Sequence, residues 1–237
     1  MLLTTREAAV LLKTSERQIY RWVDESEIPF RRVRDQVRFD RTDLLEWATS
    51  RRLPVSLEAF DEGLEPEDRA PSLADALRLG GVHHDVPATD RDSALRAVVS
   101  LMPMPPSVDR EFLIEVLLAR ESTSSTAIGD GIAIPHVRQP VVAAGAKAAV
   151  SVSYLREPVP FGALDGKAVA TVFFIVSPTV RTHLQVLAHL ARALLDPGFH
   201  AALQRRAKTE ELAMEAARLK VIFPRAPGPS TSDEGAD

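Results

Sequence analysis

A break in composition divides this chain into a short amino-terminal part and a longer carboxy-terminal part. Residues 53–71 carry six acidic side chains and one arginine, a net charge of −5, with three prolines and one glycine among them. A segment so rich in charge, proline and glycine buries little apolar surface and is typical of a linker. We therefore expect domains at residues 1–52 and 72–222. The Pro, Gly, Ser and acidic content of residues 223–237 predicts a disordered tail.

The overall composition is that of a globular protein. Of 237 residues, 45% are hydrophobic and 26% are charged, enough to bury a full core. The absence of cysteine excludes disulfides, thiolate zinc sites and thiol nucleophiles. The start lacks the basic-then-apolar order of a signal peptide, and the longest apolar run, Ala168 to Val176, is too short to span a bilayer. These features predict a cytoplasmic protein with no membrane partner.

Two helix-start signals follow closely in the first domain. Thr4 with Glu7 fits a capping box, and Ser15 with Gln18 repeats the pattern. Two capped helices so near each other are typical of a helix-turn-helix. The apolar stripe from Ile19 to Val23 should face the core. The outward face of the second helix then carries Arg17, Gln18, Tyr20 and Arg21.

A basic hairpin is predicted directly after these helices. Residues 30–39 alternate apolar side chains with arginine about a turn at Asp35-Gln36. Its arginines are Arg31, Arg32, Arg34 and Arg38. An exposed helix carrying Arg and Gln can read base edges, and an arginine hairpin can hold phosphates or enter the minor groove. The alternative is a solvated basic face, but the clustering beside the helix pair favours double-stranded DNA as the partner.

These residues resemble the excisionase-type, MerR-like winged helix-turn-helix family over about residues 1–52. The matching segments are Leu3-Thr-Thr-Arg-Glu-Ala-Ala9, Ser15-Glu-Arg-Gln-Ile-Tyr-Arg-Trp22, Ile28-Pro-Phe, Val37-Arg-Phe and Asp43-Leu-Leu-Glu-Trp47. The resemblance implies a small α+β domain whose second helix enters the major groove and whose hairpin wing contacts the backbone or minor groove. Family wings usually turn on glycine, whereas Arg34-Asp35-Gln36 stands here. A homodimer on two half-sites would suit one small head, although no heptad repeat supports it.

The second domain mixes helical and strand patterns. Helical spacing covers Leu73 to Leu79, Ala94 to Leu101, Phe112 to Arg120, His183 to Leu195 and Thr209 to Arg218. Strand-like runs cover Ala146 to Leu155 and Val169 to Ser177. Helices before and after strands predict an α/β layered domain with a mixed sheet flanked by helices.

One stretch of this domain, Ser124 to His136, has the features of a reactive or ligand-binding site. Gly129 and Gly131 allow a sharp turn, and residues 132–134 form a short apolar run that predicts a buried strand. His136 then follows at the strand end. Because imidazole titrates near neutrality, a fraction is always the neutral nucleophile that phosphoryl transfer requires. Taken alone, the histidine is equally well a polar residue at a strand end.

Together with its surroundings, this stretch resembles the enzyme IIA domain of the phosphotransferase system (PTS), of the fructose/mannitol and nitrogen-regulatory type, over about residues 72–222. The matching residues are Arg120-Glu121, Ser125-Thr126, Ile128-Gly129, Gly131-Ile-Ala-Ile-Pro-His136, Pro160-Phe161, Leu164-Asp165-Gly166, Val169 to Pro178 and Thr182-His183-Leu184.

The resemblance implies that His136 accepts a phosphoryl group from the PTS phosphocarrier protein. Arg120 would pair with the phosphoryl oxygens, His183 would lie beside His136, and Ser125 and Thr126 would offer further donors. Singly, each has a plainer explanation: Arg120 as a helix cap, His183 as a helix-start residue, Thr126 as packing. No metal and no cofactor is demanded.

Three functions remain open from the sequence. The first is a DNA-binding transcriptional regulator whose IIA-like domain senses PTS phosphorylation through His136. The second is a phosphocarrier that passes the group to a IIB partner, and the third is an interaction module that takes no phosphoryl group. In the first two, the chain is a phosphohistidine acceptor rather than a stand-alone catalyst. The DNA-binding head favours the first, with IIB or another regulatory protein as a further partner.

Overall fold

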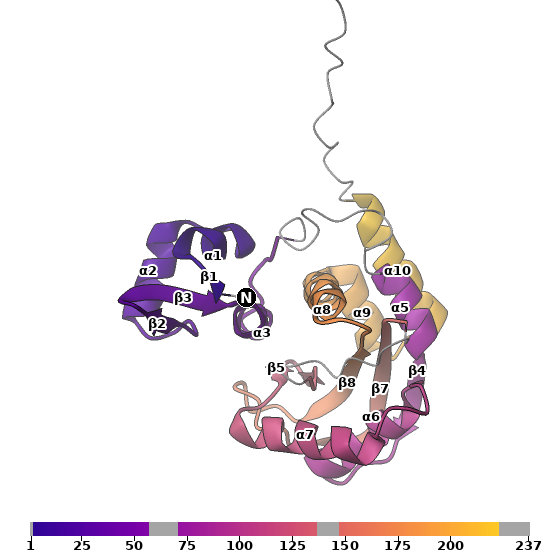
Figure 1. Cartoon of the computed structure of the whole chain (residues 1–237). Helices are drawn as coiled ribbons and strands as arrows, with labels where there is room; N and C mark the ends of the chain where they lie inside the picture. The colour runs from indigo at the N-terminus through magenta and orange to yellow at the C-terminus, as the bar shows by residue number, and fades with distance from the viewer. Residues whose placement is uncertain (1, 57–70, 137–146, 223–237) are drawn as a thin grey trace, which may run out of the picture.

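The computed structural model of the protein describes residues 2–56, 71–136 and 147–222 (Figure 1). Most of the expected linker and the whole expected tail lie outside these ranges. The first residues of the expected linker belong to the amino-terminal fold, because Val55 is buried and the Ser56 N–H donates to the Leu11 carbonyl at 2.8 Å. We call residues 2–56 the head and residues 71–222 the body.

The head combines helices with a small antiparallel sheet of strand order β1-β3-β2. Its elements are β1 (Leu2–Leu3), α1 (Thr5–Leu11), α2 (Glu16–Asp24), β2 (Arg31–Val33), β3 (Gln36–Asp40) and α3 (Arg41–Ser50).

Side chains cap the head helices as the sequence predicts. The Thr4 N–H donates to the Glu7 carboxylate at 2.7 Å, while the Glu7 N–H donates to the Thr4 hydroxyl at 3.2 Å. The Ser15 hydroxyl accepts from the Gln18 N–H at 3.2 Å, and Asp40 caps α3 in the same manner. These caps satisfy N–H groups that have no acceptor within the helix.

The hairpin turn lies one residue earlier than expected. Arg34 and Asp35 occupy it, with φ of 49° and 62°, whereas Gln36 already begins β3 and pairs with Val33. Positive φ at both central residues is typical of two-residue hairpin turns, whose twist matches that of the strands. The turn is therefore made without the glycine that is usual at this point.

The body is built on a five-stranded mixed sheet of order β4-β7-β8-β6-β5, which confirms the predicted α/β class. β4 runs parallel to β7 and β6 parallel to β8, while the other pairs are antiparallel. The elements are α5 (Leu73–Gly80), β4 (Val82–Val86), α6 (Arg91–Leu101), α7 (Arg110–Thr123), β5 (Ala127–Gly129), β6 (Ile132–Ala133), β7 (Ala149–Val159), β8 (Val169–Val176), α8 (Val180–Leu194), α9 (Pro197–Gln204) and α10 (Thr209–Ile222).

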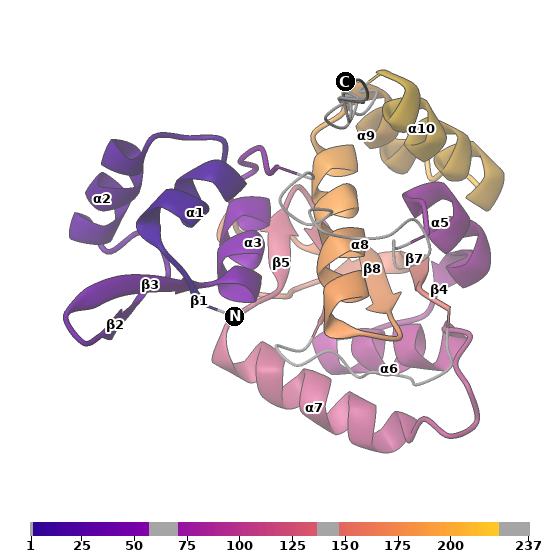
Figure 2. The same cartoon turned by 45° about the horizontal axis from the view of Figure 1, so that its top comes forward.

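Helices cover both faces of this sheet. α6 and α7 lie on one face, and α5, α8, α9 and α10 lie on the other (Figures 1 and 2). Successive side chains of a strand point to opposite faces. Phe173 and Ile175 therefore pack with α8 and α9, and Phe174 and Val176 with α6 and α7.

Three body elements, β4, β5 and α9, were not predicted, and β7 is longer than the sequence pattern suggested. β7 continues through Glu157 and Pro158 to Val159, beyond the predicted run that ends at Leu155. A register shift between Tyr154 and Val159 accommodates the irregular stretch. The proline is tolerated because the local pairing is already disrupted there.

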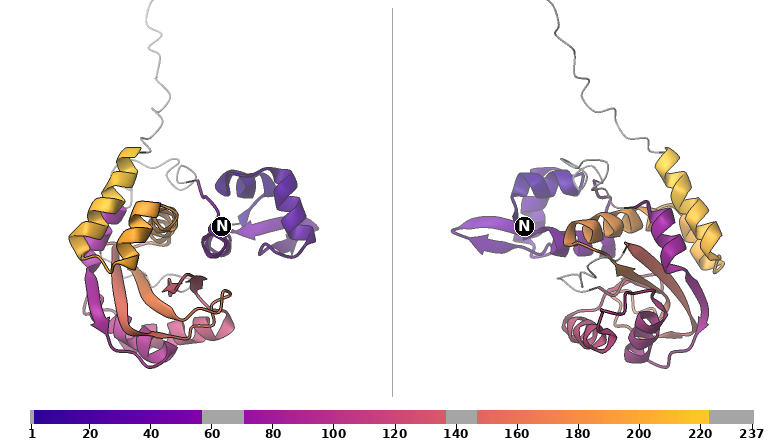
Figure 3. Two further views of the ribbon diagram at one scale, coloured as in Figure 1. Left: turned by 180° about the vertical axis from the view of Figure 1, so that it is seen from behind. Right: turned by 45° about the vertical axis from the view of Figure 1, so that its right-hand side comes forward.

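Within the described ranges the head meets the body mainly through α3, and Arg52 just after this helix adds an ion pair with Asp130. α3 contacts α8 and the edge strand β5, and it lies between the two parts (Figures 1 and 2). α2 and the β2–β3 hairpin lie on the opposite side of the head (Figure 3). The apolar core of the head is continuous with the core beneath α8.

Candidate functional site

His136 is delivered to the head-facing side of the body by a tight hairpin. β5 and β6 are joined at Asp130 and Gly131, whose φ values of 50° and 71° are left-handed. β6 then runs parallel to β8, with Ile132 opposite Thr171. His136 follows two residues after the buried Ile134 and is itself only 6% exposed. The predicted short buried strand is thus present as β6 over Ile132–Ala133, and His136 follows it after Ile134 and Pro135.

The two ring nitrogens of His136 have different partners. Nδ1 lies 2.6 Å from the Ile134 carbonyl oxygen. A carbonyl can only accept, so Nδ1 carries a proton and donates it. In the neutral ring the lone pair must therefore lie on Nε2, and Nε2 is the nucleophilic atom.

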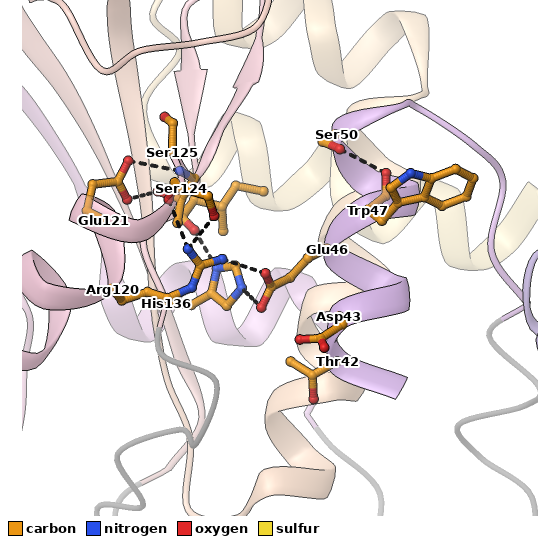
Figure 4. Close-up of polar contacts among 12 residues, drawn as sticks. Thr42, Asp43, Glu46, Trp47, Ser50, Arg120, Glu121, Ser124, Ser125 and His136 are labelled. Carbon is orange, nitrogen blue, oxygen red and sulfur yellow. Dashed lines mark hydrogen bonds and ion pairs between the residues drawn. The ribbon is translucent and has the colours of Figure 1, made fainter. Parts of the chain in front are cut away.

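Arg120 extends from the last turn of α7 toward this histidine (Figure 4). Its Nη1 donates to the Ser124 carbonyl at 2.9 Å and to the Ser124 hydroxyl at 2.8 Å. Its Nη2 donates to the Glu46 carboxylate at 2.7 Å. The guanidinium thus serves both as a cap for the end of α7 and as a fixed cation beside His136.

Glu46 comes from the head, on α3, and closes the site (Figure 4). One carboxylate oxygen lies 2.6 Å from the His136 Nε2, and the other contacts Arg120 at 2.7 Å. The Glu46 side chain is 15% exposed. A single carboxylate from one end of the chain therefore bridges both polar groups of the body site.

Proton affinities follow from this contact. Burial lowers the pKa of His136, but the adjacent Glu46 carboxylate outweighs burial and raises the pKa above its ordinary value. Burial raises the pKa of Glu46, but attraction to His136 and Arg120 brings it down to about 2. The contact thus favours the protonated form of His136 and the ionised form of Glu46.

His183 lies beside His136, as expected, but with a different character. It sits near the start of α8, which is capped by Thr179, and the two imidazole centroids are 6.2 Å apart. Within the described ranges neither ring nitrogen of His183 has a hydrogen-bond partner. Burial, reinforced by the positive His136, lowers the pKa of His183 to about 3. The second imidazole is therefore neutral.

Ser125 and Thr126 also lie at the site, and the donors of Thr126 are already engaged. The buried Glu121 accepts from the Thr126 N–H at 2.9 Å and from the Thr126 hydroxyl at 2.6 Å. The Ser125 hydroxyl accepts from the Ala127 N–H at 3.1 Å, which leaves its own proton available. Thr126 thus fixes the loop through Glu121, whereas Ser125 keeps a free donor for a ligand.

These groups border a pocket of about 230 Å³ between head and body. Its polar and aromatic lining includes Glu46, Trp47, Arg120, Ser124, Ser125 and His136. Among the described residues no cluster of three or more histidines and acids could hold a metal ion. Glu46 and Glu121 were not singled out from the sequence. No local pattern marks Glu46, and only the spacing of Glu121 from Thr126 hints at its partner.

The predicted DNA-binding residues gather on α2 and the hairpin, away from the pocket. On α2, Arg17, Tyr20 and Arg21 are exposed, while Gln18 is half-buried. On the hairpin, Arg31, Arg32 and Arg34 are exposed, and the half-buried Arg38 contacts Gln36 and the Val37 carbonyl. Arg31 lies 3.6 Å from Asp43 on α3. Both elements lie on the side of the head opposite the body (Figures 1 and 3).

None of the described helices has the length and apolar character needed to cross a bilayer.

Two family models match the chain. The model described as "Phosphoenolpyruvate-dependent sugar phosphotransferase system, EIIA 2" matches residues 77–216. A model described as "Helix-turn-helix domain" matches residues 2–52 and indicates DNA as a partner.

Curated relatives and a solved structure agree with these matches. A nitrogen regulatory protein of Pseudomonas aeruginosa is 37% identical over 116 residues, 47% of this chain and 72% of the relative. A nitrogen regulatory protein of Klebsiella oxytoca is 30% identical over 148 residues, 61% of this chain and 90% of the relative. The crystal structure of the nitrogen regulatory protein IIA-Ntr from Neisseria meningitidis superposes with a TM-score of 0.50 at 28% identity. It covers 61% of this chain and 98% of that chain.

Proposed function

Because the chain belongs to the EIIA 2 family of the phosphoenolpyruvate-dependent sugar phosphotransferase system and carries a helix-turn-helix domain before it, we propose that it is a transcriptional regulator that senses PTS phosphorylation through His136. Residues 1–52 form a winged helix-turn-helix that binds double-stranded DNA. Residues 72–222 form the sensing domain, and the PTS phosphocarrier protein is the phosphoryl donor.

One observation supports this function above the others: a buried nucleophilic imidazole faces a fixed guanidinium in a chain that also carries a DNA-binding head. The Ile134 carbonyl keeps the proton on Nδ1 and so directs the lone pair of neutral His136 to Nε2. Arg120 presents a forked donor beside that atom, and a guanidinium suits the oxygens of a phosphoryl group.

The chemical step follows from these positions. Nε2 first releases its proton to solvent and then attacks the phosphorus of the donor's phosphohistidine with the freed lone pair. One N–P bond forms at His136 as the N–P bond of the donor breaks, and the donor imidazole keeps the bonding electron pair. Arg120 neutralises charge on the transferred oxygens, Ser125 offers its hydroxyl, and the neutral His183 adds no positive charge that would hold the group permanently.

Phosphorylation assays test the acceptor. We expect the chain to gain an acid-labile label from phosphoenolpyruvate when enzyme I and the phosphocarrier protein are present. The label should be absent from His136→Asn, which keeps the size and polarity of the position. A chain that gains no label would instead be the phosphorylation-silent interaction module. Rapid transfer onward to a IIB protein would favour the ordinary phosphocarrier.

DNA binding is tested separately on the head. Because α2 would read base edges, Arg17→Ala and Arg21→Ala should weaken binding at the target sequence more than at random DNA, by about 1 to 3 kcal/mol. Arg32→Ala and Arg34→Ala on the hairpin should weaken binding to all sequences and reduce its salt dependence. Arg96→Ala on the body is the matched control. Equal binding by a chain with all four head arginines replaced would contradict the assignment.

A further inference from the structure

The head places a carboxylate where the proposed function needs a phosphoryl group. Glu46 contacts the His136 Nε2 at 2.6 Å with one oxygen and the Arg120 Nη2 at 2.7 Å with the other. These are the attacking atom and the oxygen-binding cation of the proposed transfer. The Glu46 carboxylate therefore stands in for the phosphoryl oxygens, and it reaches the site from a different part of the chain (Figure 4).

Further contacts hold the head in this position. Arg52, just after α3, pairs with Asp130 in the β5–β6 turn, and Lys167 contacts the same carboxylate at 2.7 Å. α3 also packs against α8 and β5. Trp47, the next residue after Glu46, lines the pocket beside the site. The docked position thus combines an ion pair at the turn, apolar packing and the central contact of Glu46.

Docking of the head and phosphoryl transfer require different protonation states of the His136 Nε2. The Glu46 carboxylate favours a proton on this nitrogen, whereas attack on phosphorus needs a free lone pair there. A phosphoryl group on Nε2 would bring a charge of about −1.5 to −2 to the place of the carboxylate. Two like charges cannot share this buried position, since burial strengthens their repulsion. The phosphorylated site must therefore exclude Glu46.

We infer that the phosphoryl-binding site of the body is also the docking surface for the head of the same chain, with Glu46 as the competing anion, so that phosphorylation of His136 releases the head. This inference rests on the proposed function. Because binding free energies are reciprocal, a docked head must disfavour phosphorylation by the same factor by which phosphorylation disfavours docking.

Docking fixes the position of the head but does not cover the elements that face DNA. α2 and the β2–β3 hairpin point away from the body while Glu46 is docked (Figures 1 and 3). The docked head therefore keeps its basic surface accessible but holds it in one orientation relative to the body. Release converts one fixed orientation into many, which changes how two heads could address neighbouring half-sites.

Distance measurements on the full chain test docking directly. The chain contains no cysteine, so Asp24→Cys on α2 and Glu115→Cys on α7 provide two unique spin-label positions, both exposed. We expect one narrow distance distribution in the otherwise unchanged chain and a broad distribution in Glu46→Gln. Glu27→Gln is the matched control, because Glu27 pairs with Arg51 within the head at 3.8 Å. A narrow distribution in all three would overturn the inference.

Phosphorylation supplies the second half of the test. Treating the labelled chain with phosphoramidate, a chemical phosphoryl donor, should broaden the distribution, whereas His136→Asn should not respond. With the protein donor, Glu46→Gln should be labelled about 5- to 150-fold faster than the unchanged chain, the range of typical coupling energies. Equal rates, or phosphorylation without broadening, would overturn the inference.

These arms separate this inference from the proposed function. If phosphoramidate releases the head but the phosphocarrier protein transfers nothing, docking competition stands and the PTS-sensing function fails. If the phosphocarrier protein labels His136 equally fast with and without Glu46, the function stands and the competition fails. If neither donor phosphorylates even Glu46→Gln, both fail. A narrow distribution that is lost on dilution would assign the contact to a second copy and overturn docking within one chain.

Discussion

At the scale of single residues, Arg120 makes three contacts that only a forked side chain can make together. Nη1 holds the end of α7 through Ser124, and Nη2 faces Glu46. Lysine has one ammonium group and cannot serve both ends at once. We expect Arg120→Lys to lower the rate of phosphoryl labelling by about 10-fold or more, in the range of a lost charge-stabilising donor. Arg96→Lys is the control, because Arg96 lies on the surface 3.4 Å from Glu111. Its rate of phosphoryl labelling should equal that of the unchanged chain.

A pH dependence of docking follows from the same site. The pKa of His136 is raised above its ordinary 6.5, so its contribution is fully present below 6.5 and is lost as pH rises through the raised value. The pKa of Glu46 is lowered from 4.5 to about 2, so its contribution is present above 4.5 and is lost as pH falls toward 2. Docking should therefore be strongest between pH 4.5 and pH 6.5, where both contributions are fully present.

The second imidazole, His183, does not titrate in this window. It stays neutral because its pKa is lowered to about 3. Spin-label distances recorded across the alkaline range should show the head leaving as pH rises above neutral. Glu46→Gln should show no such transition. A release midpoint that is the same in both chains would place the titrating group elsewhere.

At the scale of elements, α5 can lie on β7 only because its last residue has no side chain. A Cβ on Gly80 would lie 2.2 Å from the Val150 carbonyl oxygen. Since backbone atoms of a central strand cannot move aside cheaply, we expect Gly80→Ala to lower the free energy of unfolding by about 1 to 3 kcal/mol or more. Leu79→Ala, at an exposed position of the same helix, should change it by less than about 0.5 kcal/mol. Urea denaturation monitored by circular dichroism measures both.

Elements with strong local signals were predictable, and elements that depend on tertiary pairing were not. Capping side chains at Thr4 and Ser15 marked the first two head helices correctly, because capping is a local hydrogen bond. β4 was missed because this edge strand contains His83, His84 and Asp85, which break any apolar alternation. α9 was missed because it is only eight residues long and begins at a proline.

In the site, too, residues within local motifs were predictable, and a residue placed by tertiary contact was not. His136, Arg120 and His183 could be grouped from family-like motifs. In the structure His136 and Arg120 line one pocket, and the His183 ring lies 6.2 Å from that of His136. Glu46 could not be found in this way. It stands on α3 between the apolar Leu45 and Trp47, and its partners are far away in sequence. A contact between separately recognisable domains depends on their docking, and no periodicity or cap encodes that.

At the scale of the whole molecule, the Arg52–Asp130 ion pair lets docking be weakened without touching His136. Arg52 is 45% exposed, so its contribution should be about 0.2 to 1 kcal/mol. We expect Arg52→Gln to raise the phosphoryl labelling rate by a factor of up to about 5, well below the effect of Glu46→Gln. Arg78→Gln, which removes an ion pair to Glu210 within the body, is the control. An unchanged rate in Arg52→Gln would mean that this pair does not help to hold the head.

The tryptophans have a consequence for observing the molecule. The chain has two, Trp22 and Trp47, which meet edge to face at 5.0 Å inside the head. Trp47 also lines the pocket that the body closes. Indole emission shifts to longer wavelength when water reaches the ring, and the body contains no tryptophan to obscure the signal. The protein therefore carries its own optical reporter of the head's departure, readable in real time without a label.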